Sequence, residues 1–271
     1  MDAFYQSRKG IWSRSRMLWE ALRLDDSMEH LRRRGGNAPF VVAVAGAGGK
    51  TSIIKQLAWE GRERGLRVLV LTTTHMYRPF SFGVLDREPD RVREALDLQG
   101  LAVTGHLEEN GKISFQGWEY YCQVIKGAQL VLVEADGSKR LPLKVPGENE
   151  PVLPEHTDLL LCVYGLSALG RPASDVCFRQ TEAEKLLGKE VFCGQWQVER
   201  DHVEQLMELG YLKPLREKMA GYGLGCQVLP VFHQADTEAY QEMGRDMLEE
   251  MGEEKGIVTG NFWKTQSFEL F

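Results

Sequence analysis

Residues 40–51 read FVVAVAGAGGKT, and this stretch decides the expected fold. Its first six residues are apolar without interruption, which predicts a strand buried on both faces, as in a parallel sheet. A glycine-rich turn follows, and apolar residues then recur at helical spacing from Ile53 to Ala58. A second run, residues 67–71, is apolar after its first residue, Arg67, and predicts the next strand. Strand, turn, helix and strand form a βαβ unit, which is right-handed almost without exception.

The turn between the first strand and the helix has the composition of a phosphate-binding loop. Backbone N–H groups and the positive end of the helix dipole face an anion in such a loop, and glycines allow its close approach. Lys50 is expected to span the β- and γ-phosphates, and the hydroxyl of Thr51 to bind Mg²⁺. The predicted nucleotide ligands in this loop are Gly46, Ala47, Gly48, Gly49, Lys50, Thr51 and Ser52.

The spacing of the loop departs from the common pattern G-x-x-x-x-G-K-[ST]. That pattern places its first glycine where this chain has Val44, so the loop here begins at Gly46 and is shorter. Such a compact loop resembles the one in Mur-type peptide ligases. A strand before it and a helix after it favour phosphate binding over an ordinary strand-to-helix turn.

The rest of the chain continues the same alternation of strands and helices. Three further, mostly apolar runs predict buried strands, at residues 129–133, 159–163 and 227–232. The expected fold class is α/β and similar to P-loop NTPases, with a mostly parallel sheet flanked by helices. Residues 37–271 are predicted to form this domain, with a helical region around 180–221. Residues 1–36 carry many arginines between apolar positions and are predicted to form a basic amphipathic helical segment.

Two carboxylates follow the third predicted strand. Glu134 comes directly after it and Asp136 two residues later, so both are expected at the carboxyl ends of the strands, where open α/β sheets bind ligands. Because Mg²⁺ prefers oxygen ligands, Thr51, Glu134 and Asp136 are the predicted metal ligands. Lys50, Glu134 and Asp136 are the predicted catalytic residues, with one carboxylate holding the metal and the other polarising water. The alternative is that a carboxylate caps a turn or pairs with a nearby cation such as Lys139.

Polar residues at other strand ends are further candidates for the nucleotide site. Thr73, Thr74 and His75 follow the second strand and are expected to reach phosphate, metal or a second substrate, although threonine also favours strands for its branched Cβ. Lys139 is expected to neutralise phosphate charge, as is Lys144, and a solvated role is the alternative for each.

The sequence His233-Gln234-Ala235-Asp236 follows the last predicted strand. Guanine-specific GTPases carry Asn-Lys-x-Asp in this place, and its aspartate recognises the base. Only Asp236 matches, so the expected nucleotide is ATP or GTP, with Asp236 as a candidate ligand of the base.

Composition and charge limit the classes of partner. The 271 residues are 43% hydrophobic and 27% charged, which predicts a globular chain. The net charge of −6 argues against general nucleic-acid binding, which needs a broad cationic surface. No apolar run approaches the roughly 20 residues that cross a bilayer, and the N-terminal residues lack the apolar stretch of a secretory signal. We therefore expect a cytoplasmic protein with no membrane or nucleic-acid partner.

Four segments resemble those of the YqeC family: residues 44–51 (VAGAGGKT), 71–76 (LTTTHM), 134–144 (EADGSKRLPLK) and 164–170 (YGLSALG). Members of this family are described as accessory proteins of selenium-dependent molybdenum hydroxylases. The resemblance implies a nucleotide-dependent helper in the maturation of a molybdenum enzyme or its cofactor. It also supports Lys50, Thr51, Glu134 and Asp136 as the site.

Three functions remain open at this point. The first is a Mg²⁺-dependent NTPase that serves as a maturation factor, in which bound nucleotide orders residues 72–80 and 137–150 and hydrolysis releases a client. The second is an ATP-dependent ligase or kinase that acts on a small acid or cofactor precursor, as the Mur-like loop suggests. The third is a non-catalytic binder of a phosphate-bearing pterin cofactor. The expected partners are thus a nucleotide and either a molybdenum hydroxylase or its pterin cofactor.

Overall fold

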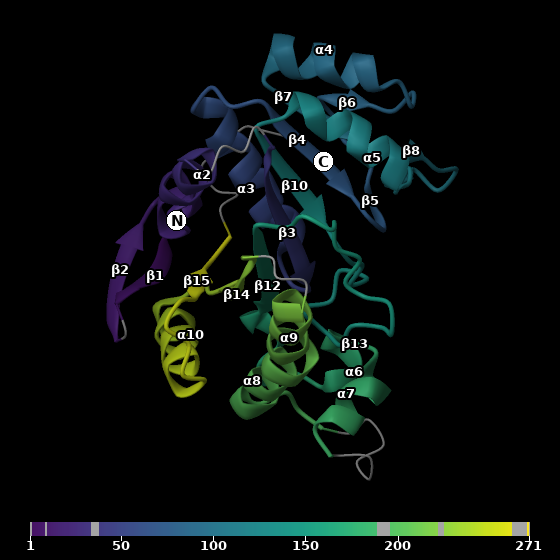
Figure 1. Ribbon diagram of the computed structural model, residues 1–271. Coiled ribbons are helices and arrows are strands. Elements are labelled where there is room, and N and C mark those ends of the chain that lie inside the picture. Colours follow the sequence, from purple (N-terminus) through teal and green to yellow (C-terminus); the bar gives the residue numbers. More distant parts are fainter. Residues whose placement is uncertain are drawn as a thin grey trace.

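A large, mostly parallel sheet forms the centre of the protein. The computed structural model describes residues 2–8, 10–33, 38–188, 196–221, 225–261 and 270. Within these residues, ten strands form one sheet: β1 (Ala3–Arg8), β2 (Ile11–Ser15), β3 (Phe40–Gly46), β4 (Val68–Thr72), β6 (Gly83–Val84), β7 (Leu101–Thr104), β10 (Leu130–Glu134), β12 (Leu159–Gly165), β14 (Gln227–His233) and β15 (Ile257–Thr259). Their order is β2-β1-β15-β14-β12-β3-β10-β4-β7-β6 (Figure 1). All strands from β15 to β6 in this order run parallel.

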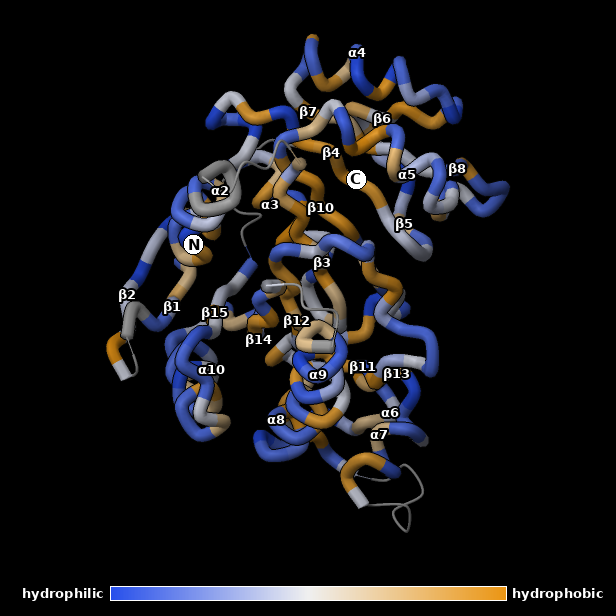
Figure 2. Tube along the Cα trace, viewed as in Figure 1, coloured by the Kyte–Doolittle hydropathy of each residue, from blue (hydrophilic) through white to orange (hydrophobic). Residues whose placement is uncertain are grey.

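Helices cover both faces of this sheet, so the predicted arrangement of a parallel sheet flanked by helices is confirmed. One face packs against α1 (Leu18–Ala21), α2 (Leu24–Arg33) and α3 (Lys50–Glu63). The other face packs against α4 (Pro89–Gln99), α5 (Trp118–Val124), α6 (Ala173–Val176), α8 (Arg200–Met207), α9 (Lys213–Gly221) and α10 (Glu238–Glu250). Neighbouring residues of β3 enter opposite cores, as Val41 and Val42 do. Figure 2 shows the apolar residues concentrated in the central strands, because a strand covered on both faces is apolar at every position.

Strand β3 lies where the order of the strands reverses. The chain runs from β3 through α3 to β4 on one side, and β12 and β14 are added later on the other side. On the first side, the last residue of β10, Glu134, lies opposite Val44 of β3 and Thr72 of β4. Open α/β sheets bind ligands outside the carboxyl ends of the strands at such a reversal. The loop that follows β3 therefore occupies the position that this architecture favours for a ligand.

Shorter elements complete the described part of the chain. β5 (His75–Tyr77), β8 (His106–Leu107) and β9 (Lys112–Ser114) form an antiparallel sheet, and β11 (Leu143–Lys144) pairs with β13 (Cys177–Phe178). The remaining helical elements are η1 (Ile125–Gly127), η2 (Leu166–Ala168), α7 (Gln180–Leu186) and the π-helical turn η4 (Glu208–Leu212), which joins α8 to α9. The helical region predicted around 180–221 is present, and its residues 189–195 lie outside the described residues. No helix in the described ranges combines the length and the apolar composition that a membrane crossing requires.

The N-terminal segment differs from the helix predicted over residues 1–36. Strands β1 and β2 form a hairpin, and β1 pairs antiparallel with β15, so that Ala3 lies opposite Thr259. Helical structure begins at Leu18 and divides into α1 and α2 near Arg23, whose φ is +51°. The helical prediction is wrong for the hairpin, whose strand β1 is held by β15, a partner far away in the sequence that local periodicity does not reveal. Residues 34–36 of the predicted segment lie outside the described residues.

Glu60 of α3 fixes the start of α1. One of its carboxylate oxygens accepts a hydrogen bond from the backbone N–H of Leu18 at 3.0 Å, and the other accepts one from Trp19 at 2.6 Å. Gln56 donates a further hydrogen bond at 2.6 Å. Burial raises the pKa of Glu60 because water no longer stabilises its charge. The carboxylate thus supplies acceptors that the first turn of a helix does not find within itself.

Replacement of Glu60 by Ala should lower the free energy of unfolding by about 2 kcal/mol, since two buried N–H groups lose their acceptor. Urea denaturation followed by circular dichroism measures this loss. Glu63→Ala is the matched control, because Glu63 lies on the same helix and is exposed, and it should change stability by less than about 0.5 kcal/mol. Equal effects of the two substitutions would contradict the assigned role of Glu60.

Candidate functional site

The backbone N–H groups of the loop between β3 and α3 donate hydrogen bonds to acceptors within the protein. The N–H group of Gly46 donates to both carboxylate oxygens of Asp136 at 3.1 and 3.0 Å. Ala47 donates to the carbonyl oxygen of Val163 at 2.7 Å, and Gly48 to that of Leu141 at 3.1 Å. The N–H groups left without intrahelical acceptors are those of the first turn of α3. An anion would therefore meet the start of α3 rather than the N–H groups of residues 46–48.

Tight packing explains why the loop contains glycine. Gly46 has a φ of +100°, and a Cβ there would lie 2.2 Å from the carbonyl oxygen of Val163. Gly48 has a φ of +71°, and a Cβ there would lie 2.4 Å from the backbone nitrogen of Gly165. The loop thus lies directly on the end of β12. Close packing adds a second reason for glycine to the phosphate approach that the sequence suggests.

His233 supports the loop from β14. Its Nδ1 lies 2.9 Å from the carbonyl oxygen of Gly48, and the side chain is buried. Burial lowers the pKa of His233 to about 4, so the imidazole is neutral at pH 7. His233 therefore packs against the loop as a neutral side chain.

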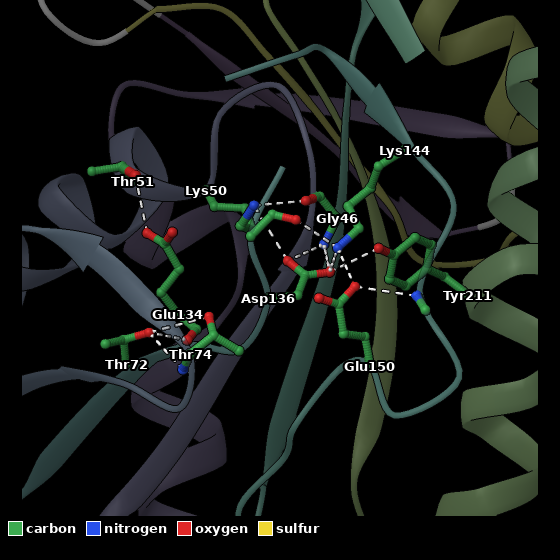
Figure 3. A network of polar contacts seen from close by, with 12 residues as sticks. Gly46, Lys50, Thr51, Thr72, Thr74, Glu134, Asp136, Lys144, Glu150 and Tyr211 are labelled. Carbon is green, nitrogen blue, oxygen red and sulfur yellow. Dashed lines mark hydrogen bonds and ion pairs between the residues drawn. The ribbon is translucent and has the colours of Figure 1, made fainter. Parts of the chain in front are cut away.

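Asp136 is the centre of a buried polar network (Figure 3). Besides the N–H of Gly46, its carboxylate meets the ammonium groups of Lys50 at 3.3 Å and Lys144 at 3.0 Å. The hydroxyl of Tyr211 donates to it at 2.8 Å. The side chain of Asp136 is fully buried, and its charge is stabilised by these donors rather than by water.

A second carboxylate continues the network. Glu150 accepts hydrogen bonds from Lys144 at 2.7 Å, from Arg179 at 2.6 Å and from the N–H of Gly147 at 3.2 Å. Burial alone would raise the pKa of Glu150, but the hydrogen bonds from Arg179 and Lys144 outweigh it and lower the pKa to about 2. The segment after β10, which the sequence predicts a nucleotide to order, is thus already fixed by ion pairs within the protein.

Glu134 lies apart from this network, toward the first turn of α3 (Figure 3). Its carboxylate accepts a hydrogen bond from the hydroxyl of Thr51 at 3.0 Å, and its backbone carbonyl accepts one from Thr72 at 2.9 Å. Burial raises the pKa of Glu134, while the charge of Lys50 acts in the opposite direction. A hydroxyl and a carboxylate oxygen meet here beside the loop, and these are hard ligands of the kind that Mg²⁺ takes.

The other predicted ligands divide into those near the loop and those held elsewhere. Thr73 donates through its hydroxyl to the carbonyl oxygen of Val152 at 2.6 Å, and the N–H of Thr74 donates to the hydroxyl of Thr72 at 3.0 Å. These two residues therefore shape the end of β4. Ala47 and Gly49 complete the loop, and Ser52 follows in the first turn of α3.

Three predicted ligands make their contacts away from the loop. His75 is exposed on β5 and lies 3.3 Å from a carboxylate oxygen of Glu108. Lys139 is exposed, with its ammonium 4.6 Å from the ring centre of Phe178. Asp236 accepts hydrogen bonds from the backbone and side chain of Asn261 at 2.7 and 2.9 Å. The structure thus joins Lys50, Thr51, Glu134 and Asp136 around the loop but does not bring these three to it.

Sequence patterns do not indicate three members of the network: Glu150, Arg179 and Tyr211. They come from separate segments, and Tyr211 lies in the π-helical turn η4. Lys144 is predicted from sequence to neutralise phosphate charge, but its fully buried ammonium contacts Asp136, Glu150 and the carbonyl oxygen of Gly137 instead. A single π-helical turn often marks a functional position, but nothing in the local sequence predicts one here.

Known proteins match the part of the chain that carries this site. A family model described as YqeC protein matches residues 42–181. The Uncharacterized protein YqeC of Escherichia coli strain K12 is 35% identical over 142 residues, which are 50% of this chain and 56% of the relative. The match thus spans little more than half the length of that relative. The signal recognition particle receptor FtsY of Elizabethkingia anophelis aligns with 88% of this chain and 56% of its own, at 13% identity and a TM-score of 0.25, which is too low to indicate a shared fold.

Replacement of Gly48 by Ala should lower the free energy of unfolding by at least about 2 kcal/mol, because the added Cβ meets backbone atoms that cannot move aside. Gly111→Ala is a control with nearly the same backbone, since Gly111 has a φ of +75° and a Cβ added there would meet no atom within 4 Å. It should cost only the strain of the backbone, about 1 kcal/mol. Chemical denaturation of both variants measures the difference, and an equal loss would argue against close packing of the loop.

Proposed function

Because the chain belongs to the YqeC family, we propose that the residues within its family match bind a nucleoside triphosphate in the manner of P-loop NTPases. The single observation that carries this proposal is the meeting of Thr51 and Glu134 at 3.0 Å beside the first turn of α3. This pair lies at the carboxyl ends of the strands, next to the reversal of strand order. The phosphates are bound by the N–H groups of the first turn, with the helix dipole adding positive potential.

Lys50 supplies the positive charge for the phosphates. Its ammonium donates a hydrogen bond to the carbonyl oxygen of Gly46 at 2.6 Å and forms an ion pair with Asp136 at 3.3 Å. The ion pair is the longer of the two contacts, and it is the one that phosphate replaces in this proposal. Lys50 thus binds phosphate without giving up its contact with Gly46.

Thr51 and Glu134 fit a magnesium ion by the chemistry of their oxygens. In this proposal both residues would hold Mg²⁺, which neutralises phosphate charge when it is bound. The buried Glu134 has few other donors around it, so an added cation would compensate its charge. Mg²⁺ that binds together with the nucleotide therefore adds positive charge beside the carboxylate of Glu134.

Asp136 receives a different role from the one expected from sequence. Its carboxylate is occupied by Gly46, Lys50, Lys144 and Tyr211, and it is fully buried. We assign to it the positioning of the loop, and to Glu134 the metal and the attacking water. Asp136 thus shapes the site, and Glu134 takes part in its chemistry.

Mg²⁺-ATP, Mg²⁺-GTP or both should raise the melting temperature of the wild type by about 5 °C or more at 100 times the Kd, because the ligand binds only the folded state. CTP serves as a third nucleotide. Lys50→Ala should abolish the shift, and Glu134→Gln should abolish its dependence on Mg²⁺. Lys126→Ala, which removes an exposed lysine, should leave it unchanged. No shift with any nucleotide would refute the proposed binding and direct attention to a phosphate-bearing pterin.

Wild-type protein should release phosphate from its nucleotide without any acceptor, and Glu134→Gln should slow this release by roughly 100-fold if Glu134 stabilises the attacking water. A continuous phosphate-release assay measures both rates. ADP that forms only when a small acid or cofactor precursor is added would instead identify a ligase or kinase. Following the family resemblance, we further propose that hydrolysis serves the maturation of a selenium-dependent molybdenum hydroxylase. Addition of such an enzyme as client should then change the rate of release, and an unchanged rate would remove this part of the proposal.

A further inference from the structure

Two lysine ammonium groups lie beside the buried carboxylate of Asp136. Among the described residues, the charged members of the network around it are Lys50, Lys144 and Arg179 on one side and Asp136 and Glu150 on the other. Lys50, Lys144 and Asp136 are buried, whereas Glu150 and Arg179 are partly exposed. Glu134 lies on the hydroxyl of Thr51, where the charge of Lys50 also acts on it. Asp136 thus has two buried cations for its one charge, and one of the two is in surplus there.

The contacts identify Lys50 as the surplus cation. The ammonium of Lys144 donates hydrogen bonds to Glu150 and to the carbonyl oxygen of Gly137, both at 2.7 Å, and forms an ion pair with Asp136 at 3.0 Å. Its side chain is fully buried, so no ligand can reach it. Lys50 has a longer ion pair with Asp136, 3.3 Å, and its hydrogen bond goes to the carbonyl oxygen of Gly46 instead. If Lys50 turns to a ligand, the buried carboxylate of Asp136 keeps Lys144 as its counter-ion.

We propose that Lys144 is the permanent counter-ion of Asp136 and that it thereby releases Lys50 for the phosphates of the ligand. This inference rests on the proposed function, since it describes how the same site becomes ready for nucleotide. Lys144 is a positioning residue, because it acts through Asp136 and touches no ligand. Its own position is fixed by Glu150, which Arg179 holds at 2.6 Å. The segment between β10 and β12 thus contributes to phosphate binding without lining the site.

Without Lys144, Lys50 should remain paired with Asp136. In Lys144→Met the carboxylate of Asp136 has only one cation left, and a buried carboxylate without a partner is strongly unfavourable. Lys50 can then reach phosphate only by leaving that charge unpaired. The expected result is a Kd for Mg²⁺-ATP or Mg²⁺-GTP that rises by about tenfold or more, measured by isothermal titration calorimetry.

The double variant Asp136→Asn with Lys144→Met separates this role from simple packing. It removes both charges, so Lys50 is no longer held, and its Kd should lie within about threefold of that of Asp136→Asn alone. If Lys144 served only as packing, the double variant would bind as weakly as Lys144→Met or more weakly. Lys126→Met is the control for an exposed lysine outside the network, and its Kd should follow that of the wild type.

The outcomes distinguish this inference from the proposed function. Wild type that binds neither nucleotide overturns both. Wild type that binds, together with a folded Lys144→Met variant of unchanged Kd, overturns only the role of Lys144. If Lys144→Met does not fold, the comparison of Asp136→Asn with the double variant decides. A further loss of tenfold or more on adding Lys144→Met overturns the inference, and equal Kd values support it.

Discussion

The carboxylate of Asp136 is the interaction on which the arrangement of the site depends. It joins the loop after β3, through the N–H of Gly46, to Lys144 of β11 and to Tyr211 of the π-helical turn. These segments lie far apart in the sequence, and no other single group among the described residues contacts all of them. A buried charge is tolerated only when donors surround it, so the requirement for those donors brings the segments together. The shape of the loop follows from how this one charge is accommodated.

Two carboxylates only two residues apart have different surroundings. Glu134 ends β10 beside Thr51, whereas Asp136 turns inward between two ammonium groups. Burial raises the pKa of Glu134, and a carboxylate in such a position gains from the arrival of a cation. Asp136 already has its cations. The backbone between them is fixed by the hydrogen bond from Ala135 to Val44, so neither side chain can take the place of the other.

The centre of the fold could be predicted from sequence, because a strand covered on both faces is apolar throughout and a glycine-rich turn before a helix has few alternatives. Phe40 to Ala45 and Leu130 to Val133 are confirmed as buried strands on this basis. The edge of the sheet could not be predicted, since β15 has only three residues and its partner β1 lies at the other end of the sequence. Lys50, Thr51 and Glu134 follow strands and were recognisable from their positions. The contacts of Tyr211 and Glu150 depend on tertiary packing that no local pattern contains.

The pairing of Ala3 with Thr259 has a consequence for how the chain acquires its structure. During synthesis on the ribosome, β1 is made about 250 residues before β15, the strand with which Ala3, Phe4 and Tyr5 pair. The hairpin can therefore form early, while its place beside β15 becomes available only when almost all of the sheet exists. Contacts between such distant parts of a sequence slow folding, because a long loop must close before they form. Until then the unpaired edge of β1 can pair with other chains. The pairing of β1 with β15 removes this exposed edge.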